Sequence, residues 1–261
     1  MLAWVTACSS GERPSSAASV QTNTWKQVTA SASWSPRRYA ASVAFNGRLW
    51  LIGGSFKGGN RTNTVWYSVD GQAWTKVAAP WSVRSSHALV VHDGRMWILG
   101  GYGPGFEGRY TNDVWSSADG LEWVRVTESA GWSPRRYFPA VSYDGKLWVL
   151  GGYNAGGELH DVWSSPDGRE WTQVLERAPW IGRAGHVAVV HNGRIWVLGG
   201  AADNNCEIKA LNDVWSTADG TQWTEATAHA AWPGRRTPAA VVLSGRIWLM
   251  GGRLGGGVFP R

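Results

Sequence analysis

Residues 81–101, WSVRSSHALVVHDGRMWILGG, contain the pattern that decides the fold. Asp93-Gly94 separates two short apolar runs, and such a pair is the strongest short-range signal for a β-hairpin, because both turn residues take positive φ. Trp81 and Arg84 stand before the first run, and a Gly-Gly pair ends the second. The stretch therefore predicts two antiparallel strands, A and B, bounded by fixed residues.

The same arrangement recurs five times with a period of about 50 residues, which is typical of propeller blades and similar arrays. The Gly-Gly pairs begin at Gly53, Gly100, Gly151, Gly199 and Gly251, and an Arg stands sixteen residues before each, at Arg37, Arg84, Arg135, Arg183 and Arg235. Four units continue into a second hairpin, strands C and D, with turns at Asp70-Gly71, Asp119-Gly120, Asp167-Gly168 and Asp219-Gly220. In the first unit we expect strands at residues 40–45, 49–52, 65–69 and 74–77. No segment shows a sustained helical period.

The composition is that of a folded chain: the 261 residues are 43% hydrophobic and 17% charged. Lys and Arg (25) exceed Asp and Glu (19), which gives a formal charge of +6. No basic run or base-stacking motif accompanies this excess, so we expect no nucleic-acid partner. Two cysteines exclude a disulfide framework and a multi-cysteine metal cluster. No apolar run in the sequence reaches the roughly 18–20 residues that a membrane-spanning helix needs.

The chain is rich in tryptophan, and 19 of its 20 Trp residues fall at four repeated positions. Five lie in the W-x-x-R motif, five in strand B, four in strand C and five in strand D. A large ring at every blade position is expected to pack between blades, with its N–H on a backbone carbonyl. We therefore interpret the tryptophans as structural.

These residues resemble the kelch-repeat β-propeller family, which shares its fold with galactose oxidase. The matching features are the Gly-Gly pair, the Arg before strand A, the turn Gly and the Trp of strand D, over about residues 23–252. The resemblance implies an all-β, kelch-type propeller of four-stranded antiparallel blades, five of them recognisable and the last incomplete. Residues 25–28 look like an isolated strand D, and the last unit has only strands A and B. This pattern favours a chain that ends before its natural C-terminus over an irregular closure.

The N-terminal residues suggest a location. Val5-Thr6-Ala7-Cys8 resembles a bacterial lipoprotein box, which makes Cys8 a lipidation candidate. We expect residues 1–22 to be a truncated signal-like segment and flexible tether, and residues 23–261 to form the propeller. The repeated N-D-V-W-S-[ST]-x-D-G-x-x-W motif also resembles bacterial envelope kelch proteins. We therefore predict an outer-membrane or surface lipoprotein, or a periplasmic or secreted protein; the alternative is a chance match in a frayed terminus.

Binding residues are expected on the face that carries the D–A and B–C connections, where the sequence is least regular. The Arg of the W-x-x-R motif occurs in every blade, so we assign it a structural role, bonding carbonyls or a carboxylate of a neighbouring blade. The next position varies, and Arg there is a better ligand contact. The ligand-binding candidates are Arg38, Arg136, Arg236, Tyr39, Tyr137, His87, His186 and Arg109. Arg forks beside aromatic rings suit carboxylates, phosphates or acidic sugars, whereas the alternative is a solvated basic rim.

The function predicted from these features is a non-catalytic binding or scaffold module that recognises a protein, acidic or glycan partner on this face. The alternative is a carbohydrate-active enzyme resembling a sialic acid mutarotase or a sialidase, with Glu107, Glu158 or Glu207 as its base. We assign no catalytic residue and expect no cofactor or metal. The histidine spacings match no metal motif, and Cys206 has no nearby Tyr for the galactose oxidase copper site.

Overall fold

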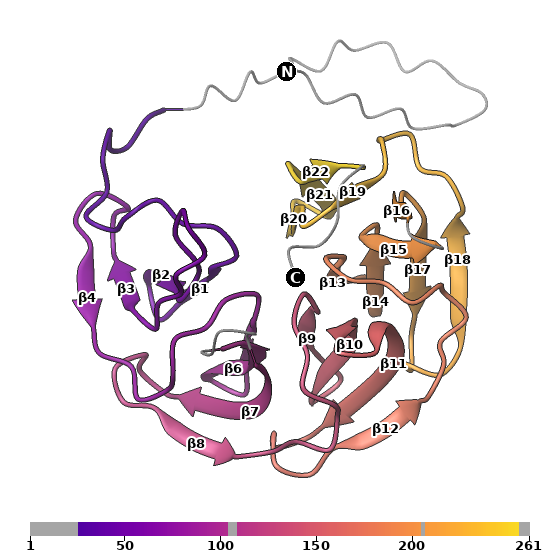
Figure 1. The fold of residues 1–261 in the computed structure, drawn as a ribbon, viewed down its shortest axis with the longest axis horizontal. Helices are drawn as coiled ribbons and strands as arrows, with labels where there is room; N and C mark the ends of the chain where they lie inside the picture. The colour runs from indigo at the N-terminus through magenta and orange to yellow at the C-terminus, as the bar shows by residue number, and fades with distance from the viewer. Residues whose placement is uncertain (1–25, 104–108, 205–206, 256–261) are drawn as a thin grey trace.

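The computed structural model describes residues 26–103, 109–204 and 207–255, and all their regular elements are β-strands (Figure 1). Residues 1–22, predicted to form the tether, lie outside the described residues, as do Trp25 and Cys8. Within the described chain, no helix is long and apolar enough to cross a membrane.

Four antiparallel sheets of four strands follow one another around a common axis (Figure 1). Blade 1 contains β1 (Ala41–Phe45), β2 (Arg48–Ile52), β3 (Val65–Ser68) and β4 (Thr75–Val77). Blade 2 contains β5 (Ala88–His92), β6 (Arg95–Tyr102), β7 (Tyr110–Ser117) and β8 (Val124–Thr127). Blade 3 contains β9 (Ala140–Tyr143), β10 (Lys146–Asn154), β11 (Gly157–Ser165) and β12 (Thr172–Leu175). Blade 4 contains β13 (Val187–His191), β14 (Arg194–Leu198), β17 (Val214–Thr217) and β18 (Trp223–Thr227). The predicted propeller of four-stranded blades is confirmed.

Blade 5 is smaller: its main sheet pairs only β20 (Ala239–Leu243) with β21 (Arg246–Met250). A short second sheet pairs β19 (Arg235–Arg236) with β22 (Arg253–Leu254). The first strands of successive blades contact one another in the order β1, β5, β9, β13 and β20, and the described ring is open between blade 1 and blade 5 (Figure 1). Residues 26–28 are not in a strand, so the isolated strand D predicted there is wrong for its described part.

The A–B turns explain why the hairpins form where the sequence predicts them. Asn46 and Gly47 have φ values of 47° and 67°, and the corresponding pairs in the other four blades also have positive φ. Two successive left-handed residues give a turn whose twist matches that of the flanking strands. The strands predicted for blade 1 agree with those observed to within about one residue.

The B–C connections are more regular than predicted. In blades 2 and 3 the ladder resumes after the Gly-Gly pair, with a shift in register between Leu99 and Gly101 and between Leu150 and Gly152. In blade 4 the connection forms its own hairpin, β15 (Ala201–Asn204) with β16 (Glu207–Ala210). A loop was expected at these positions because a Gly-Gly pair usually ends a strand. Here the positive φ of both glycines bends the strand without ending its pairing.

The Gly-Gly pair also joins neighbouring blades. The N–H of the second Gly donates to the carbonyl of the W-x-x-R arginine in the next blade, and the N···O distances at Gly54–Arg84, Gly101–Arg135, Gly152–Arg183 and Gly200–Arg235 are 2.9, 3.0, 3.0 and 2.9 Å. A Cβ on Gly101 would lie 2.8 Å from His87 Cβ and 3.0 Å from Ser85 O, closer than real Cβ atoms come to such neighbours. Glycine is therefore required both by its φ of 116° and by the close approach.

Tryptophan packing between blades holds the ring together. Trp50, Trp97 and Trp148 of strand B are at most 5% exposed, and each donates its ring N–H to a backbone carbonyl five residues earlier. The W-x-x-R tryptophans depart from this prediction. Among the described residues, the indole N–H groups of Trp34, Trp81, Trp132 and Trp180 have no hydrogen-bond partner. Their rings instead stand edge-on to the strand D tryptophan of the same blade, with centroids 4.8–5.8 Å apart.

Candidate functional site

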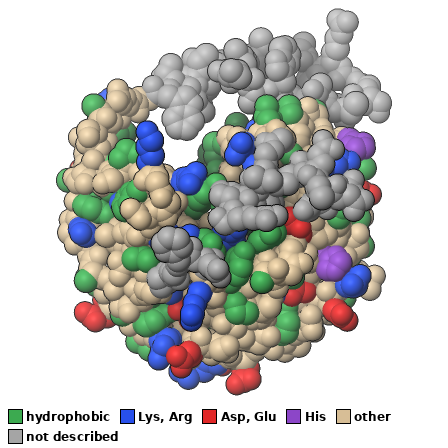
Figure 2. Space-filling view, in the orientation of Figure 1, with side chains coloured by type: hydrophobic (Ala, Val, Ile, Leu, Met, Phe, Trp, Pro, Cys, Tyr) green, Lys and Arg blue, Asp and Glu red, His purple; other side chains and the backbone are tan. Residues whose placement is uncertain are grey.

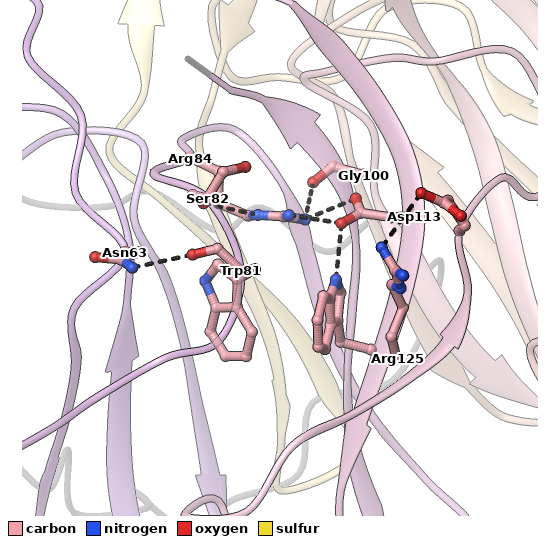
Figure 3. A network of polar contacts seen from close by, with 9 residues as sticks. Asn63, Trp81, Ser82, Arg84, Gly100, Asp113 and Arg125 are labelled. Atoms are coloured by element: carbon pink, nitrogen blue, oxygen red, sulfur yellow. Dashed lines mark hydrogen bonds and ion pairs between the residues drawn. The ribbon is translucent and has the colours of Figure 1, made fainter.

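The W-x-x-R arginines lie inside their own blades. Arg84 is 1% exposed and donates to the carbonyl of Gly100 at 3.1 Å, while both its terminal nitrogens meet Asp113, at 2.9 and 2.7 Å (Figure 3). Blades 3 and 4 repeat this arrangement with the pairs Arg135–Asp161 and Arg183–Asp213. The expectation of a carboxylate from a neighbouring blade is wrong, because strand C of the same blade carries the Asp next to the Gly-Gly carbonyl.

The carboxylates of Asp113 and Asp213 are held ionised, because the net shift of each pKa is downward. Burial raises the pKa of Asp113, but the hydrogen bonds and the charge of Arg84 together lower it by more, so the net shift is downward. The indole N–H of Trp115 adds a third hydrogen bond to Asp113 at 2.7 Å. Blade 1 differs because Thr64 replaces the Asp: Arg37 bonds Thr64 Oγ1 at 3.0 Å, and among the described residues the buried N–H of Trp66 has no partner.

A backbone ladder positions the variable residues that follow the W-x-x-R arginine. The second residue after that arginine has a φ between 50° and 64° in every blade, and its N–H donates to the carbonyl of its counterpart in the preceding blade. The ladder consists of Ser86–Tyr39, Tyr137–Ser86, Gly185–Tyr137 and Thr237–Gly185, with N···O distances of 2.9, 3.1, 2.8 and 2.6 Å. Residues distant in sequence are thus brought together at one end of the propeller.

Each variable position also faces the residue that follows the Gly-Gly pair of its blade. These antiparallel bridges are Arg38–Ser55, Ser85–Tyr102, Arg136–Tyr153, Ala184–Ala201 and Arg236–Arg253. Tyr102 and Tyr153 were not among the ligand-binding residues predicted from the sequence. The signal that could have found them is their fixed place directly after the glycines, opposite the variable residue.

The residues of blades 1, 2 and 3 surround a cavity of about 100 Å³. Its lining consists of Arg38, Tyr39, Ser55, Gly59, Arg61, Ser85, Tyr102, Arg136 and Tyr137. We call this the Arg-Tyr pocket. Among the described residues, three arginines and no carboxylate line it, so this lining is positively charged. In the view of Figure 2, several Lys and Arg side chains lie nearer the centre of the disc, whereas Asp and Glu side chains lie mainly along the rim.

Stacked rings hold the arginines of the pocket in place. The guanidinium carbon of Arg136 lies 4.3 Å from the ring centroid of Tyr102 and 5.0 Å from that of Tyr137, and Arg61 lies 4.0 Å from Tyr102. Tyr39 and Tyr137 form an edge-to-face pair with centroids 5.1 Å apart. A guanidinium stacked on aromatic faces loses conformational freedom but keeps the N–H donors at its edge, which suits binding of a planar anion.

Tyr137 of the pocket is protonated at neutral pH. Burial, reinforced by the neighbouring Tyr39, raises the pKa of Tyr137 to about 12. Burial also raises the pKa of Tyr110, which lies 5.4 Å from Arg136. Tyr137 therefore adds a hydroxyl donor and no negative charge to the site.

The structure brings together some predicted binding residues and separates others. Arg38, Arg136, Tyr39 and Tyr137 line the Arg-Tyr pocket. Arg236 is 5% exposed and is not among the lining residues; burial, with the nearby Arg253, lowers its pKa. Arg109 is exposed outside the lining.

The two histidines predicted to face a ligand do not face the pocket. His87 and His186 are 6% and 4% exposed, and among the described residues neither ring nitrogen of His87 has a hydrogen-bond partner. They stand three residues after the W-x-x-R arginine, where the side chain turns inward against the Gly-Gly pairs of two blades. Burial lowers the pKa of His87 to about 3 and that of His186 well below its usual value, so both are neutral at pH 7.

The groups considered for catalysis are only partly described. Glu107 lies outside the described residues, and so does Cys206. Glu158 lies in β11, and Glu207 begins β16. In the described ranges, no three His, Cys, Asp or Glu side chains are grouped as metal ligands would be.

The blades, their Gly-Gly junctions and the arginine at the start of each unit define a β-propeller built from internal repeats. A comparison with protein-family models identifies which kind: the KLHDC2/KLHL20/DRC7 Kelch-repeats domain matches residues 13–175 and 83–252. The two ranges together cover most of the chain, which therefore belongs to the kelch-repeat family. A search of curated proteins finds no relative that matches.

Proposed function

We propose that this kelch propeller is a protein-binding module whose Arg-Tyr pocket receives an acidic group of the partner. Kelch propellers generally bind proteins, and membership of the family supports this class of function. The observation that carries the choice of face is the pocket itself, where three arginines and three tyrosines meet at the end of the molecule that bears the variable residues.

The size of the pocket favours one group of a larger partner over a complete small ligand. Sites for drug-sized molecules have volumes of about 300–1,000 Å³, several times the 100 Å³ here. A carboxylate, phosphate or sulfate group fits such a volume, while the rest of the partner would lie on the surrounding B–C connections. An acidic side chain of a protein is the simplest occupant. A glycan would contribute an acidic sugar in the same way.

The donor set of the pocket does not favour the alternative function, a carbohydrate-active enzyme. That reaction needs a carboxylate close to the arginines to move a proton. The described residues that line the pocket are Arg, Tyr, Ser and Gly, a donor set that suits binding of an anion and contains no carboxylate base.

We also propose that the protein is attached to, or contained in, the bacterial cell envelope, with Cys8 as the lipidated residue. The support is the V-T-A-C sequence at residues 5–8 and the Ser- and Ala-rich stretch after it. Metabolic labelling with a fatty-acid analogue tests this: label is expected in the wild type and not in Cys8→Ser. Equal labelling of both would overturn the lipid anchor.

The pocket is tested by titrating the protein with an acidic peptide, for example Glu-rich, and with its Gln-substituted counterpart. We expect Arg38→Ala and Arg61→Ala each to weaken acidic-peptide binding by roughly tenfold, because each removes a charge-assisted contact. Arg109→Ala is the matched control, because it removes one exposed Arg that does not line the pocket. An equal loss in Arg109→Ala would indicate a diffuse basic surface instead, and tight binding of the Gln peptide would overturn recognition of an acidic group.

A further inference from the structure

Two serine side chains of the Arg-Tyr pocket are buried without a hydrogen-bond partner in the described chain. Ser55 and Ser85 are 5% and 3% exposed, and both line the cavity. Their backbone groups are paired across the bridges to Arg38 and Tyr102, but neither side-chain hydroxyl bonds a described residue. Buried polar groups are normally hydrogen-bonded, so hydroxyls that face a cavity in this way point to a polar occupant.

The three arginines of the pocket reach it from different segments of the chain. Arg38 precedes β1, Arg61 lies in the B–C connection of blade 1, and Arg136 precedes β9 of blade 3. Arg61 and Arg136 both stack on the ring of Tyr102, with their guanidinium carbons 4.0 and 4.3 Å from its centroid. Arg61 also donates to the carbonyl of Gly103 at 3.1 Å. Like charges are therefore held around the cavity by a shared ring and a backbone carbonyl.

The charge and the donors of the pocket exceed what one carboxylate uses. A carboxylate carries one negative charge and two oxygens, and a single guanidinium can bond both of them. Two positive charges would then remain around a cavity of about 100 Å³ that no described carboxylate lines. A phosphate monoester carries a charge of about −1.5 to −2 at pH 7 and has three acceptor oxygens. Three arginines and two serine hydroxyls match this group better in both charge and number of donors.

We propose that the acidic group received by the Arg-Tyr pocket is the phosphoryl group of a phosphorylated side chain, bound in preference to a carboxylate. The inference rests on the proposed function, because it takes the partner to be a protein and names the group that enters the pocket. The arginines donate charge-assisted hydrogen bonds to the phosphoryl oxygens, and the hydroxyls of Ser55 and Ser85 donate to the same oxygens. The cavity holds this group alone, and the peptide that carries it lies on the surrounding B–C connections.

The preference is tested with three short peptides of one sequence, blocked at both ends, whose central residue is phosphoserine, glutamate or serine. In calorimetric titrations at pH 7.5 we expect the phosphoserine peptide to bind about tenfold tighter than the glutamate peptide, and the serine peptide not to bind. Glutamate binding as tight as phosphoserine binding would overturn the phosphoryl preference and leave the proposed function standing. No binding of either acidic peptide would overturn both. Inorganic phosphate is the fourth probe, and if it binds as tightly as the phosphoserine peptide, the assignment to a protein partner fails.

The second charge of the phosphoryl group provides an independent readout. It is lost around pH 6, whereas a glutamate side chain titrates near pH 4.3. The titratable groups among the described lining residues are Arg and Tyr, whose ordinary pKa values lie far above this range. Between pH 7.5 and 5.5 we therefore expect phosphoserine affinity to fall several-fold and glutamate affinity to stay nearly constant. Parallel changes would contradict recognition of the dianion, because an effect of pH on the protein itself would move both affinities together.

Two variants connect the preference to the pocket. Arg38→Ala should reduce it from about tenfold to about twofold, because loss of a positive charge costs a dianion more than a monoanion. Ser85→Ala should reduce it several-fold, because it removes a donor to the third phosphoryl oxygen. Arg109→Ala is the matched control for Arg38→Ala, since it removes one exposed Arg outside the lining and should leave the preference unchanged. An unchanged preference in Arg38→Ala, or an equal fall in Arg109→Ala, would overturn the assignment of the phosphoryl group to this pocket.

Discussion

His87 makes a specific prediction about acid stability. Burial lowers its pKa from 6.5 to about 3, so between these values the unfolded chain binds a proton that the folded chain excludes. Stability therefore falls as the pH drops below 6.5 and continues to fall until about pH 3. One proton corresponds to about 1.36 kcal/mol per pH unit, so lowering the pH from 7 to 5 should cost about 2 kcal/mol for this residue alone.

The repeats supply a matched replacement. Phe138 occupies the same position in blade 3, is 5% exposed, and meets the Gly-Gly pair of the preceding blade as His87 does. His87→Phe should therefore fit and remove about 2 kcal/mol of the difference in unfolding free energy between pH 7 and pH 5. His186→Phe should change the pH dependence in the same direction.

The assay is urea unfolding followed by tryptophan fluorescence at several pH values from 7.5 to 5. This range lies above the titration of the carboxylates whose pKa values are lowered, such as Asp219 at about 2, where N–H groups of Gln222 and Thr221 stabilise the ionised form. If His87→Phe keeps the pH dependence of the wild type, the residue does not lose its proton on folding and the argument fails.

Two further predictions use comparisons between blades. Gly120→Ala places a Cβ against the ring of Trp50, whereas the Cβ of Gly71→Ala, at a similar φ, meets no atom closer than 3.7 Å. We expect Gly71→Ala to lower the unfolding free energy by about 1 kcal/mol through backbone strain, and Gly120→Ala to lower it by about 2–4 kcal/mol; equal urea midpoints would refute this packing. Thr64→Asp would give blade 1 the carboxylate that blades 2 to 4 have, as a partner for Arg37 and for the N–H of Trp66. We expect the unfolding free energy to rise by about 1 kcal/mol, and a fall would contradict the equivalence of the blades.

Most of the fold could be predicted from the sequence because the same local signals repeat. An Asx-Gly turn, a Gly-Gly pair with positive φ and an Asp that bonds the N–H groups of its own turn each determine a short segment by local chemistry. The extended B–C hairpins of blades 2 and 3 were missed, because Gly-Gly usually ends a strand and only the structure shows that the ladder resumes beyond it.

The candidate site was predicted less completely, for a different physical reason. Periodicity identified Arg38 and Arg136 because they interrupt a repeated pattern, but it could not tell which way a side chain turns. His87 interrupts the pattern two residues later, where strand A begins, and its ring points into the core. Tyr102 contributes to the pocket across a β-bridge to Ser85, a contact between positions that no local signal connects.

Repetition separates the residues that build this propeller from those that distinguish its blades. The buried Arg–Asp pair is present in three blades with nearly the same distances, and the ladder through Tyr39, Ser86 and Tyr137 continues whatever side chain it carries. The scaffold is therefore set by the arginine and the backbone, and the next residue is free to vary. At this variable position blades 1 and 3 carry Arg38 and Arg136, which make two sides of the pocket cationic. Blade 2 carries the smaller Ser85, which leaves space between them. An anion-binding site can thus be built on a repeat fold by changing single residues at one position, without cost to the junctions that close the blades.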